Sequence, residues 1–332
     1  MNIMKKKNKT NAKPTPTLRL HLNDLRHPGS ILFLSLLPNV EAVLETALTA
    51  IVEHLYTSPA AAVETKRPHW TFTPSIPPTR SVTLVLRDFP GVAYTTGSES
   101  DNDDKEIHFS LGYIYKCSEY ADPVSELAGV LTHELVHCYQ HTAPPPSSPG
   151  AIVPQPPGGL IEGIADFVRL KASLVPPHWK RPVSSKDRPP NWDQGYQHTA
   201  FFLAWLEDVR AGRGTIGMLN DRLLRIGYIN EGDERNEAAE QDNHRDHTHS
   251  NDNNDQSSNG STTEGNGFWN GVFGVGVLQL WEEYGRFLDG QQQSSERTDE
   301  CEDGESAGLE KRQRNDHSNN KADWEVEILN LE

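Results

Sequence analysis

The segment Leu131 to His141 constrains the fold most, because it holds two histidines and a glutamate in the order His-Glu-x-x-His. On a helix, residues four apart lie on one face, so His133 and His137 can direct imidazole nitrogens at one metal ion. Glu134 lies beside them, where it can take a proton from a metal-bound water. The spacing therefore predicts a catalytic zinc site on a helix.

The residues around this motif favour a buried helix of ordinary length. Asp122 followed by Pro123 is typical of a helix N-terminus. Three consecutive prolines, residues 144–146, end any helix soon after His141. Between these limits, an apolar stripe recurs at four-residue spacing, formed by Leu127, Leu131 and Leu135. We therefore expect the two histidines in the last turns of an amphipathic core helix.

A catalytic zinc takes three protein ligands and keeps one position for water. We expect Glu162 as the third ligand, because residues 160–174 read as a second helix after a Pro/Gly-rich loop that can reverse the chain. Asp166 shares a face with Glu162, and we expect it to orient a ligand histidine, with a direct ligand role as the alternative. His141 is a poor candidate, because residues 133, 137 and 141 of one straight helix would spread over about 12 Å of rise.

Several segments of the chain resemble the plant and fungal basic secretory protein family. The most specific are Gly-Leu-Ile-Glu-Gly-Ile-Ala-Asp at 159–166 and Trp-Asp-Gln-Gly-Tyr at 192–196. Residues 84–95, 106–110 and 129–140 also match, in the family's order. The resemblance implies a zincin-like fold, zinc bound by His133 and His137, and Glu134 as the catalytic acid and base.

The remaining pattern predicts one α+β domain, a small mixed sheet packed on helices. Strands are expected where short β-rich runs occur, at residues 18–22, 81–87 and 106–115. Helices are expected where apolar residues recur at helical spacing, at residues 38–56, 196–209 and 268–288. The domain should span residues 17–290, a length that supports a full hydrophobic core.

Two further roles follow from analogy and chemistry. In zincins the strand before the active-site helix borders the cleft, so Ile107, Phe109 and Gly112 are candidate residues for binding substrate main chain. An interior position for this strand is an equal alternative. Tyr196 is the candidate for stabilising a tetrahedral oxyanion, because a phenol hydroxyl donates a hydrogen bond without changing charge. His198 is the alternative.

Composition separates the domain from polar segments. We expect residues 1–16, which are basic, residues 231–267 and most of residues 291–332 to be disordered. Residues 231–266 hold ten acidic and two basic side chains, and residues 291–332 hold twelve and five, which explains nearly all of the net charge of −16. The acidity therefore belongs to these segments. The sequence has no basic stripe interleaved with aromatic residues, so a nucleic-acid partner is not expected.

Three cysteines without metal-type spacing support no disulfide framework. No run is long and apolar enough for a membrane span, and no secretory leader is evident, so a cytoplasmic location is expected over a secreted one. The hypothesis is a monomeric zinc peptidase acting on peptides or proteins. The alternative is a protein that keeps the fold for binding or defence with little or no turnover.

Overall fold

The computed structural model describes residues 13–57, 72–98, 101–148, 151, 153–229 and 267–302. These form a mixed α+β domain with a small sheet, as the sequence predicts. The expected disorder at 1–16 and 231–267 falls almost entirely on residues outside these ranges, and so does the tail from residue 303 onward.

The sheet has four strands, β1 (Thr17–Leu22), β2 (Ser81–Arg87), β3 (Ala93–Gly97) and β4 (Asp104–Ser110). They are ordered β1-β2-β4-β3, with β1, β2 and β4 parallel and β3 antiparallel to β4. Strand β4 is therefore interior, and β3 is an outer strand. Strand β3 was not predicted from the sequence.

The register of the strands decides which side chains face the helices. Leu84 of β2, Ile107 of β4 and Thr95 of β3 lie side by side in one row across the sheet. Leu84 and Ile107 are buried in the hydrophobic core. Because side chains in one row share a face, Thr95 continues this row to the outer edge of the sheet and faces the helices.

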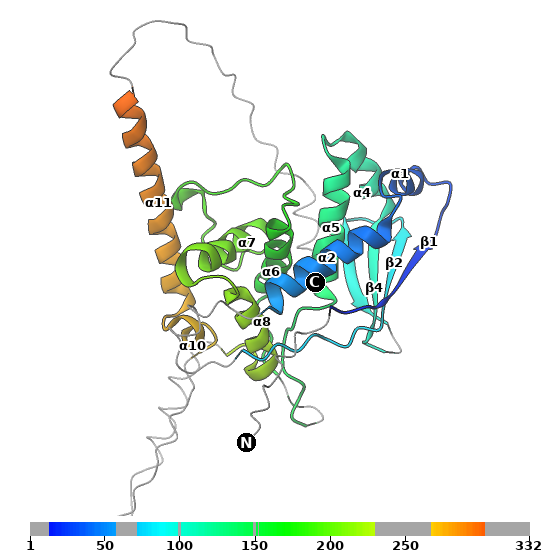
Figure 1. Ribbon diagram of the computed structural model, residues 1–332, viewed down its shortest axis with the longest axis horizontal. Coiled ribbons are helices and arrows are strands. Elements are labelled where there is room, and N and C mark those ends of the chain that lie inside the picture. Colours follow the sequence, from blue (N-terminus) through cyan, green and yellow to red (C-terminus); the bar gives the residue numbers. More distant parts are fainter. Residues whose placement is uncertain are drawn as a thin grey trace, which may run out of the picture.

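The helices form successive layers beside the sheet (Figure 1). Helix α5 (Pro123–His137) contacts β3 and β4, α6 (Gly158–Lys171) packs on α5, and α7 (Tyr196–Trp205) packs on α6. Helix α2 (Val40–Leu55) contacts α5, α6 and α8 (Thr215–Ile226). The predicted start of α5 is confirmed, since Asp122 accepts the backbone N–H of Ser125 at 2.9 Å and Pro123 is the first helical residue.

Several element boundaries differ from the predictions. The expected strand 106–115 ends at Ser110, whose hydroxyl accepts the backbone N–H of Tyr113 and starts helix α4 (Leu111–Lys116). The expected helix 268–288 is divided into α10 (Asn270–Phe273) and α11 (Val277–Glu302). The division occurs at Gly274, which has a positive φ of 73° and caps α10. Helix α11 runs beyond the expected domain boundary at 290.

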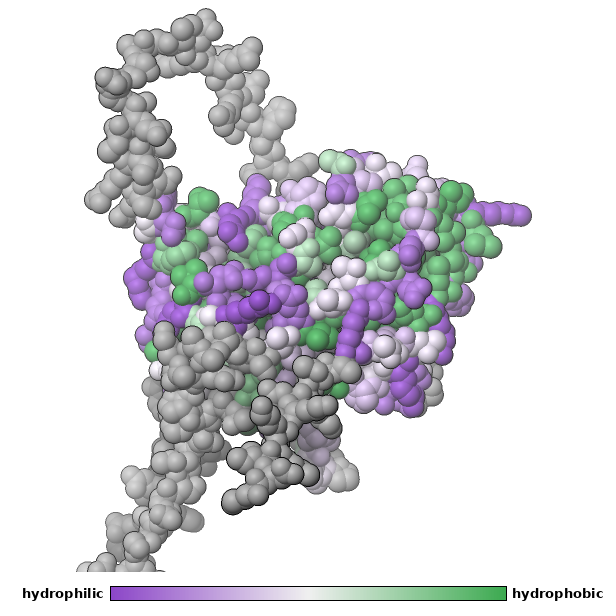
Figure 2. Space-filling view, viewed as in Figure 1, coloured by the Kyte–Doolittle hydropathy of each residue, from purple (hydrophilic) through white to green (hydrophobic). Residues whose placement is uncertain are grey.

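The first two helices of the chain join at a sharp bend. Helix α1 (Pro28–Leu36) meets α2 at 68°, and among the described residues this bent pair alone has the combined length and composition of a membrane span. No single helix within the described ranges meets that test. Hydrophobic surface gathers where α1 and α4 lie (Figure 2), and the exposed apolar side chains of these helices include Ile31, Leu34 and Tyr115.

Candidate metal centre and cleft

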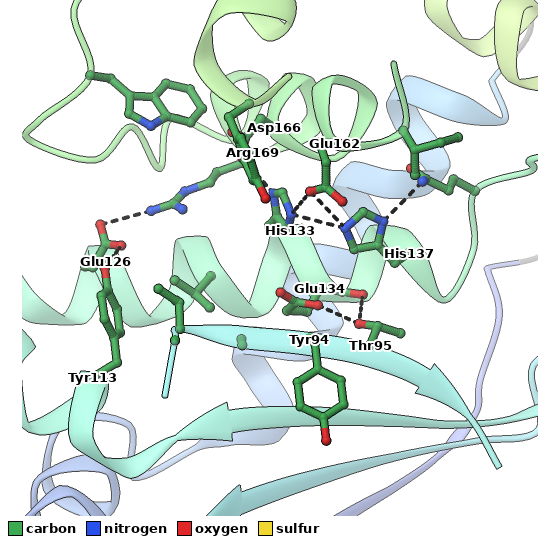
Figure 3. A pocket seen from close by; sticks show the side chains of 18 of the residues that line it. Tyr94, Thr95, Tyr113, Glu126, His133, Glu134, His137, Glu162, Asp166 and Arg169 are labelled. Atoms are coloured by element: carbon green, nitrogen blue, oxygen red, sulfur yellow. Dashed lines mark hydrogen bonds and ion pairs between the residues drawn. The ribbon is translucent and has the colours of Figure 1, made fainter. Parts of the chain in front are cut away.

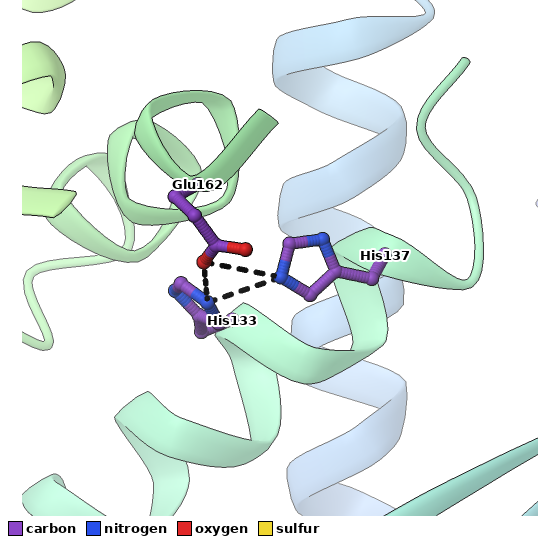
Figure 4. Close-up of side chains that lie close together, drawn as sticks. All are labelled: His133, His137 and Glu162. Atoms are coloured by element: carbon purple, nitrogen blue, oxygen red, sulfur yellow. Dashed lines mark hydrogen bonds and ion pairs between the residues drawn. The ribbon is translucent and has the colours of Figure 1, made fainter. Parts of the chain in front are cut away.

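Two helices supply the candidate metal ligands. Helix α5 carries His133 and His137 one turn apart, and α6 lies against it with Glu162 facing them (Figure 4). The Nε2 atom of His133 lies 3.1 Å from Nε2 of His137 and 3.0 Å from Oε2 of Glu162. The distance from His137 Nε2 to Glu162 Oε2 is 3.6 Å. The three ligand atoms therefore converge on one point, and this group could hold a metal ion.

The other ring nitrogen of each histidine is also engaged. Nδ1 of His133 lies 2.6 Å from Oδ1 of Asp166, which is 2% exposed. Nδ1 of His137 lies 3.1 Å from the amide nitrogen of Gln140. Asp166 thus lies where an orienting residue would be needed and outside the three-atom group. Gln140 was not predicted, although its place three residues after His137 put it on the same helical face.

Charge interactions hold this group in place. Burial alone would lower the pKa of His133, but Asp166 and Glu162 raise it well above its ordinary value. Burial would likewise raise the pKa of Glu162, but hydrogen bonds and the positive charges of the two histidines hold it far below its usual range. The carboxylate of Glu162 is therefore ionised at neutral pH, as a metal ligand must be.

Glu134 points from α5 toward the sheet (Figure 3). Its Oε2 atom accepts a hydrogen bond from the hydroxyl of Thr95 on β3 at 2.7 Å. The residue Glu134 is buried, with 6% of its surface exposed. The contact depends on β3, so Thr95 was not among the residues predicted from the sequence. It ties the outer strand directly to the glutamate of the His-Glu-x-x-His motif.

These side chains line a cleft of about 690 Å³ between β3, α5 and α6. Tyr196, the first residue of α7, belongs to its wall, and its ring stacks over that of His133 with centroids 6.2 Å apart and planes 15° apart. The backbone of Tyr196 has a φ of 44°, which side-chain-bearing residues rarely adopt. Among the described residues, the lining includes Tyr196 and not His198.

His141 lies away from the three-atom group. Its Nε2 atom is 2.8 Å from the carbonyl oxygen of Ser75, and its ring packs edge-on against Tyr56 with centroids 6.0 Å apart. Its backbone N–H donates to the side chain of Asn220 at 2.8 Å. These contacts give His141 a role in joining the end of α5 to other segments.

The structure corrects the expected substrate-binding strand. Ile107 and Phe109 are fully buried, and β4 is paired with β2 on one side and β3 on the other. Its main chain has no edge to offer a peptide. Gly112 lies on α4 and is not part of the described cleft lining. The alternative of an interior strand therefore matches the structure, in which the unpredicted strand β3 covers this side of β4.

A family described as "Peptidase of plants and bacteria" (BSP) matches residues 15–284. This chain belongs to that peptidase family. The match covers the sheet, both helices of the metal centre and α7, and it confirms the family resemblance inferred from the sequence. No curated protein and no solved structure gives a significant match to this member of the family.

Proposed function

We propose that this family member is a zinc-dependent peptidase with a zincin-like active site. The observation that supports the proposal most directly is the convergence of His133, His137 and Glu162 beside Glu134 in an open cleft. A carboxylate adjacent to a metal centre is the arrangement that general-base hydrolysis requires. Peptides or proteins are the substrates that follow from membership of a peptidase family.

The ligand group fits zinc in both spacing and chemistry. Tetrahedral zinc has bonds of about 2.0 to 2.2 Å to nitrogen and oxygen, so its ligand atoms lie about 3.3 Å apart. The three separations here are 3.0, 3.1 and 3.6 Å. Two imidazoles and one carboxylate also form a set that zinc prefers, whereas magnesium and calcium take oxygen ligands. Zinc bound here would act as a Lewis acid and lower the pKa of a water molecule.

Glu134 is the acid and base in this proposal. It takes the proton of the attacking water and then delivers it to the nitrogen of the departing amine. Thr95 holds one carboxylate oxygen by a hydrogen bond, which leaves the other for the water. The buried position of Glu134 limits its rotation, so the carboxylate stays directed at the cleft.

In this proposal, Tyr196 stabilises the oxyanion that forms at the substrate carbonyl. Its ring lies over His133 in the cleft, and its hydroxyl can donate a hydrogen bond as negative charge develops. Tyr196 and the residue before it, Gly195, both have a positive φ, which is 85° at Gly195. A left-handed backbone at a cleft residue supports a functional role, because it costs free energy that the surrounding structure must offset. Replacement of Tyr196 by Phe tests this role against that of His198.

Strand β3 is the candidate edge for substrate main chain. Of the two outer strands in the described sheet, β1 and β3, it is β3 that forms one wall of the cleft, opposite the metal group. An extended peptide can add to such an edge by main-chain hydrogen bonds. The peptide would then lie between Thr95 and the metal centre, with a carbonyl within reach of Glu134.

A peptide-library assay tests the proposal. Wild-type protein with zinc should cleave peptides, and Glu134→Gln should lower kcat/KM by about 10²- to 10⁴-fold. Glu41→Gln, an exposed change in the first turn of α2, is the matched control and should retain activity. Metal analysis should find one zinc in wild type and in Glu134→Gln, and much less in His137→Ala.

Two outcomes would contradict the proposal. Equal residual cleavage by wild type and Glu134→Gln would indicate a contaminating peptidase. Zinc binding without cleavage of any library peptide would favour the alternative of a binding or defence protein. Comparing the zinc content of His137→Ala with that of Glu134→Gln distinguishes loss of the bound metal from loss of catalysis with the metal still bound.

A further inference from the structure

We propose that one end of the cleft is a substrate side-chain subsite that selects a bulky, uncharged residue next to the cleaved bond. The proposal rests on the peptidase function proposed above and specifies the class of substrate. The subsite, called here the aromatic end of the cleft, is defined by a set of lining residues: Phe89, Val92, Tyr113, Val130 and Trp179, over the pair Glu126 and Arg169.

The aromatic end lies along the same helix faces as the metal centre. Glu126, Val130 and His133 occupy successive turns on one face of α5, so Glu126 is about 10 Å from His133 along the helix axis. On α6, Arg169 follows Asp166 in the same way and faces Glu126 (Figure 3). Consecutive residues of a peptide are about 3.8 Å apart. A large side chain beside a carbonyl at the metal centre can therefore extend toward Glu126.

The floor of this end is a buried ion pair whose groups are already engaged. Nη2 of Arg169 donates to Oε2 of Glu126 at 2.9 Å, and the hydroxyl of Tyr113 donates to Oε1 of Glu126 at 2.9 Å. Nε of Arg169 donates to the carbonyl oxygen of Leu174 at 2.9 Å. Glu126 and Arg169 are 3% and 6% exposed. The floor therefore carries no net charge for a substrate to neutralise.

Glycine and aromatic residues fix Arg169 in this position. A Cβ at Gly129 would lie 2.5 Å from Nε of Arg169, so only glycine lets the arginine lie flat on α5. The ring of Trp179 covers the guanidinium, with its centroid 5.7 Å from Cζ. Phe89 and Trp179 both line this end of the cleft and add apolar surface above the paired floor.

The opposite wall is fastened to the start of α4. The hydroxyl of Ser110 donates to the carbonyl oxygen of Phe89 at 2.8 Å. The backbone N–H of Ser110 donates to the carbonyl oxygen of Val92 at 2.9 Å. Ser110 also caps the helix that carries Tyr113. This wall is thus held in place by hydrogen bonds from Ser110 to the main chain of Phe89 and Val92.

These features predict which side chains enter. An aromatic or long aliphatic side chain would exchange contact with water for contact with Phe89, Val130 and Trp179, which is favourable. An aspartate or lysine would lose hydration, and the charges of Glu126 and Arg169 beneath it are already paired with each other, which is unfavourable. Glycine has no side chain to place in the subsite, so it would neither gain nor lose binding free energy there. The expected order of affinity is therefore aromatic or leucine first, glycine next, and charged residues last.

The test measures binding and needs no turnover. Hydroxamates, which chelate zinc, are made with Phe, Leu, Gly, Asp or Lys beside the chelating group, in two series that place the side chain on either side of it. They are titrated into zinc-loaded Glu134→Gln protein. In one series, Phe should bind at least about tenfold tighter than Gly. Asp and Lys should bind no tighter than Gly.

Three variants locate the effect. Trp179→Ala should reduce the Phe-to-Gly ratio to below about threefold, and Trp179→Phe should keep most of it. Tyr115→Ala, an exposed aromatic change on α4, should leave the ratio unaltered. Glu126→Gln leaves Arg169 without its carboxylate, so the affinity for the Asp compound should rise at least about tenfold.

Preference of the parent protein for Asp or Lys, or no preference in either series, would overturn the subsite. So would a Phe-to-Gly ratio in Trp179→Ala equal to that of the parent. Because binding is measured without cleavage, a failure of the peptidase proposal can be told apart from a failure of the subsite proposal. A protein that selects the Phe compound but cleaves no peptide would retain the subsite and lose the proposed function.

Discussion

Thr95 of the outer strand donates its hydroxyl to Oε2 of Glu134 on α5 at 2.7 Å, and the same hydroxyl lies 2.9 Å from the main-chain oxygen of Glu134. The contact links the edge that a peptide can join to the group proposed to move the proton. If a peptide pairs with β3, it therefore meets a general base already held in position.

Replacement of Thr95 by Val should lower kcat by about tenfold with little change in KM, because it removes the hydrogen bond and keeps the side-chain shape. Thr96→Val is the control, since Thr96 is the exposed neighbour and bonds to Gly97. Initial rates across peptide concentrations give both constants. A fall in kcat of the same size in both variants would exclude a specific role for Thr95.

Gln140 should strengthen metal binding through His137. Among the described residues, no donor bonds to Oε1 of Gln140, which is buried. A half-turn of the amide would place Oε1 beside Nδ1 of His137 and let it accept that N–H. This contact would direct Nε2 of His137 to the metal.

Gln140→Leu should therefore weaken zinc affinity by about 10- to 100-fold, and Gln140→Glu should restore most of it because it keeps an acceptor. Competition with a chromogenic chelator measures the affinity. Gln155→Leu, an exposed change before α6, should match wild type. Equal affinities for the Leu and Glu variants at position 140 would contradict the role of an acceptor.

The grouping of the candidate metal ligands could be predicted because its information is local. His133, Glu134 and His137 lie within one helix, and Glu162 and Asp166 lie within the next, so helical spacing alone places each set on one face. The packing of α6 on α5 then brings them together. The family match covers both segments.

The rest of the cleft depends on contacts that spacing does not encode. Strand β3 is five residues long and half exposed, too short for a period to be recognised, so Thr95 and the sheet edge were missed. Without β3, β4 was taken as a possible edge, and Ile107 and Phe109 were assigned to substrate. The Glu126 and Arg169 pair was missed because it joins residues 43 apart in the sequence.

Glu207 should make the stability of the fold depend on pH. It is 3% exposed, and burial raises its pKa, although hydrogen bonds from the backbone of Ile216 and Gly214 partly oppose this. The folded protein therefore keeps this proton to a higher pH than the unfolded chain does. The stabilising effect of that proton is full below the unfolded pKa and is lost as pH rises through the folded pKa.

Glu207→Gln should remove this dependence, so the variant should lose less stability than wild type between pH 4 and pH 7. Urea unfolding at four pH values measures the difference. Glu283→Gln should show the opposite sign, because a hydrogen bond from Arg210 lowers the pKa of Glu283 and its contribution is lost as pH falls. If the free energy of unfolding changed with pH in the same way for wild type and Glu207→Gln, a contribution of Glu207 to the pH dependence would be excluded.

Two adjacent glycines at the start of α6 offer a test of how the metal helix is packed. A Cβ at Gly159 would lie 1.8 Å from the carbonyl oxygen of Asp193 and 3.0 Å from the backbone nitrogen of Gly195. Both atoms belong to the main chain that leads into Tyr196, so neither can move without shifting the cleft wall. A Cβ at Gly158 would meet nothing within 4 Å among the described residues.

Gly159→Ala should therefore destabilise the fold by at least about 2 kcal/mol, as expected when a rigid site is overpacked. It should also weaken zinc binding, because the shift moves α6 and Glu162 relative to α5. Gly158→Ala should change the free energy of unfolding by no more than about 0.5 kcal/mol. Urea unfolding with and without zinc measures both effects. Equal stability of the two variants would show that α6 does not require this close approach to the segment before Tyr196.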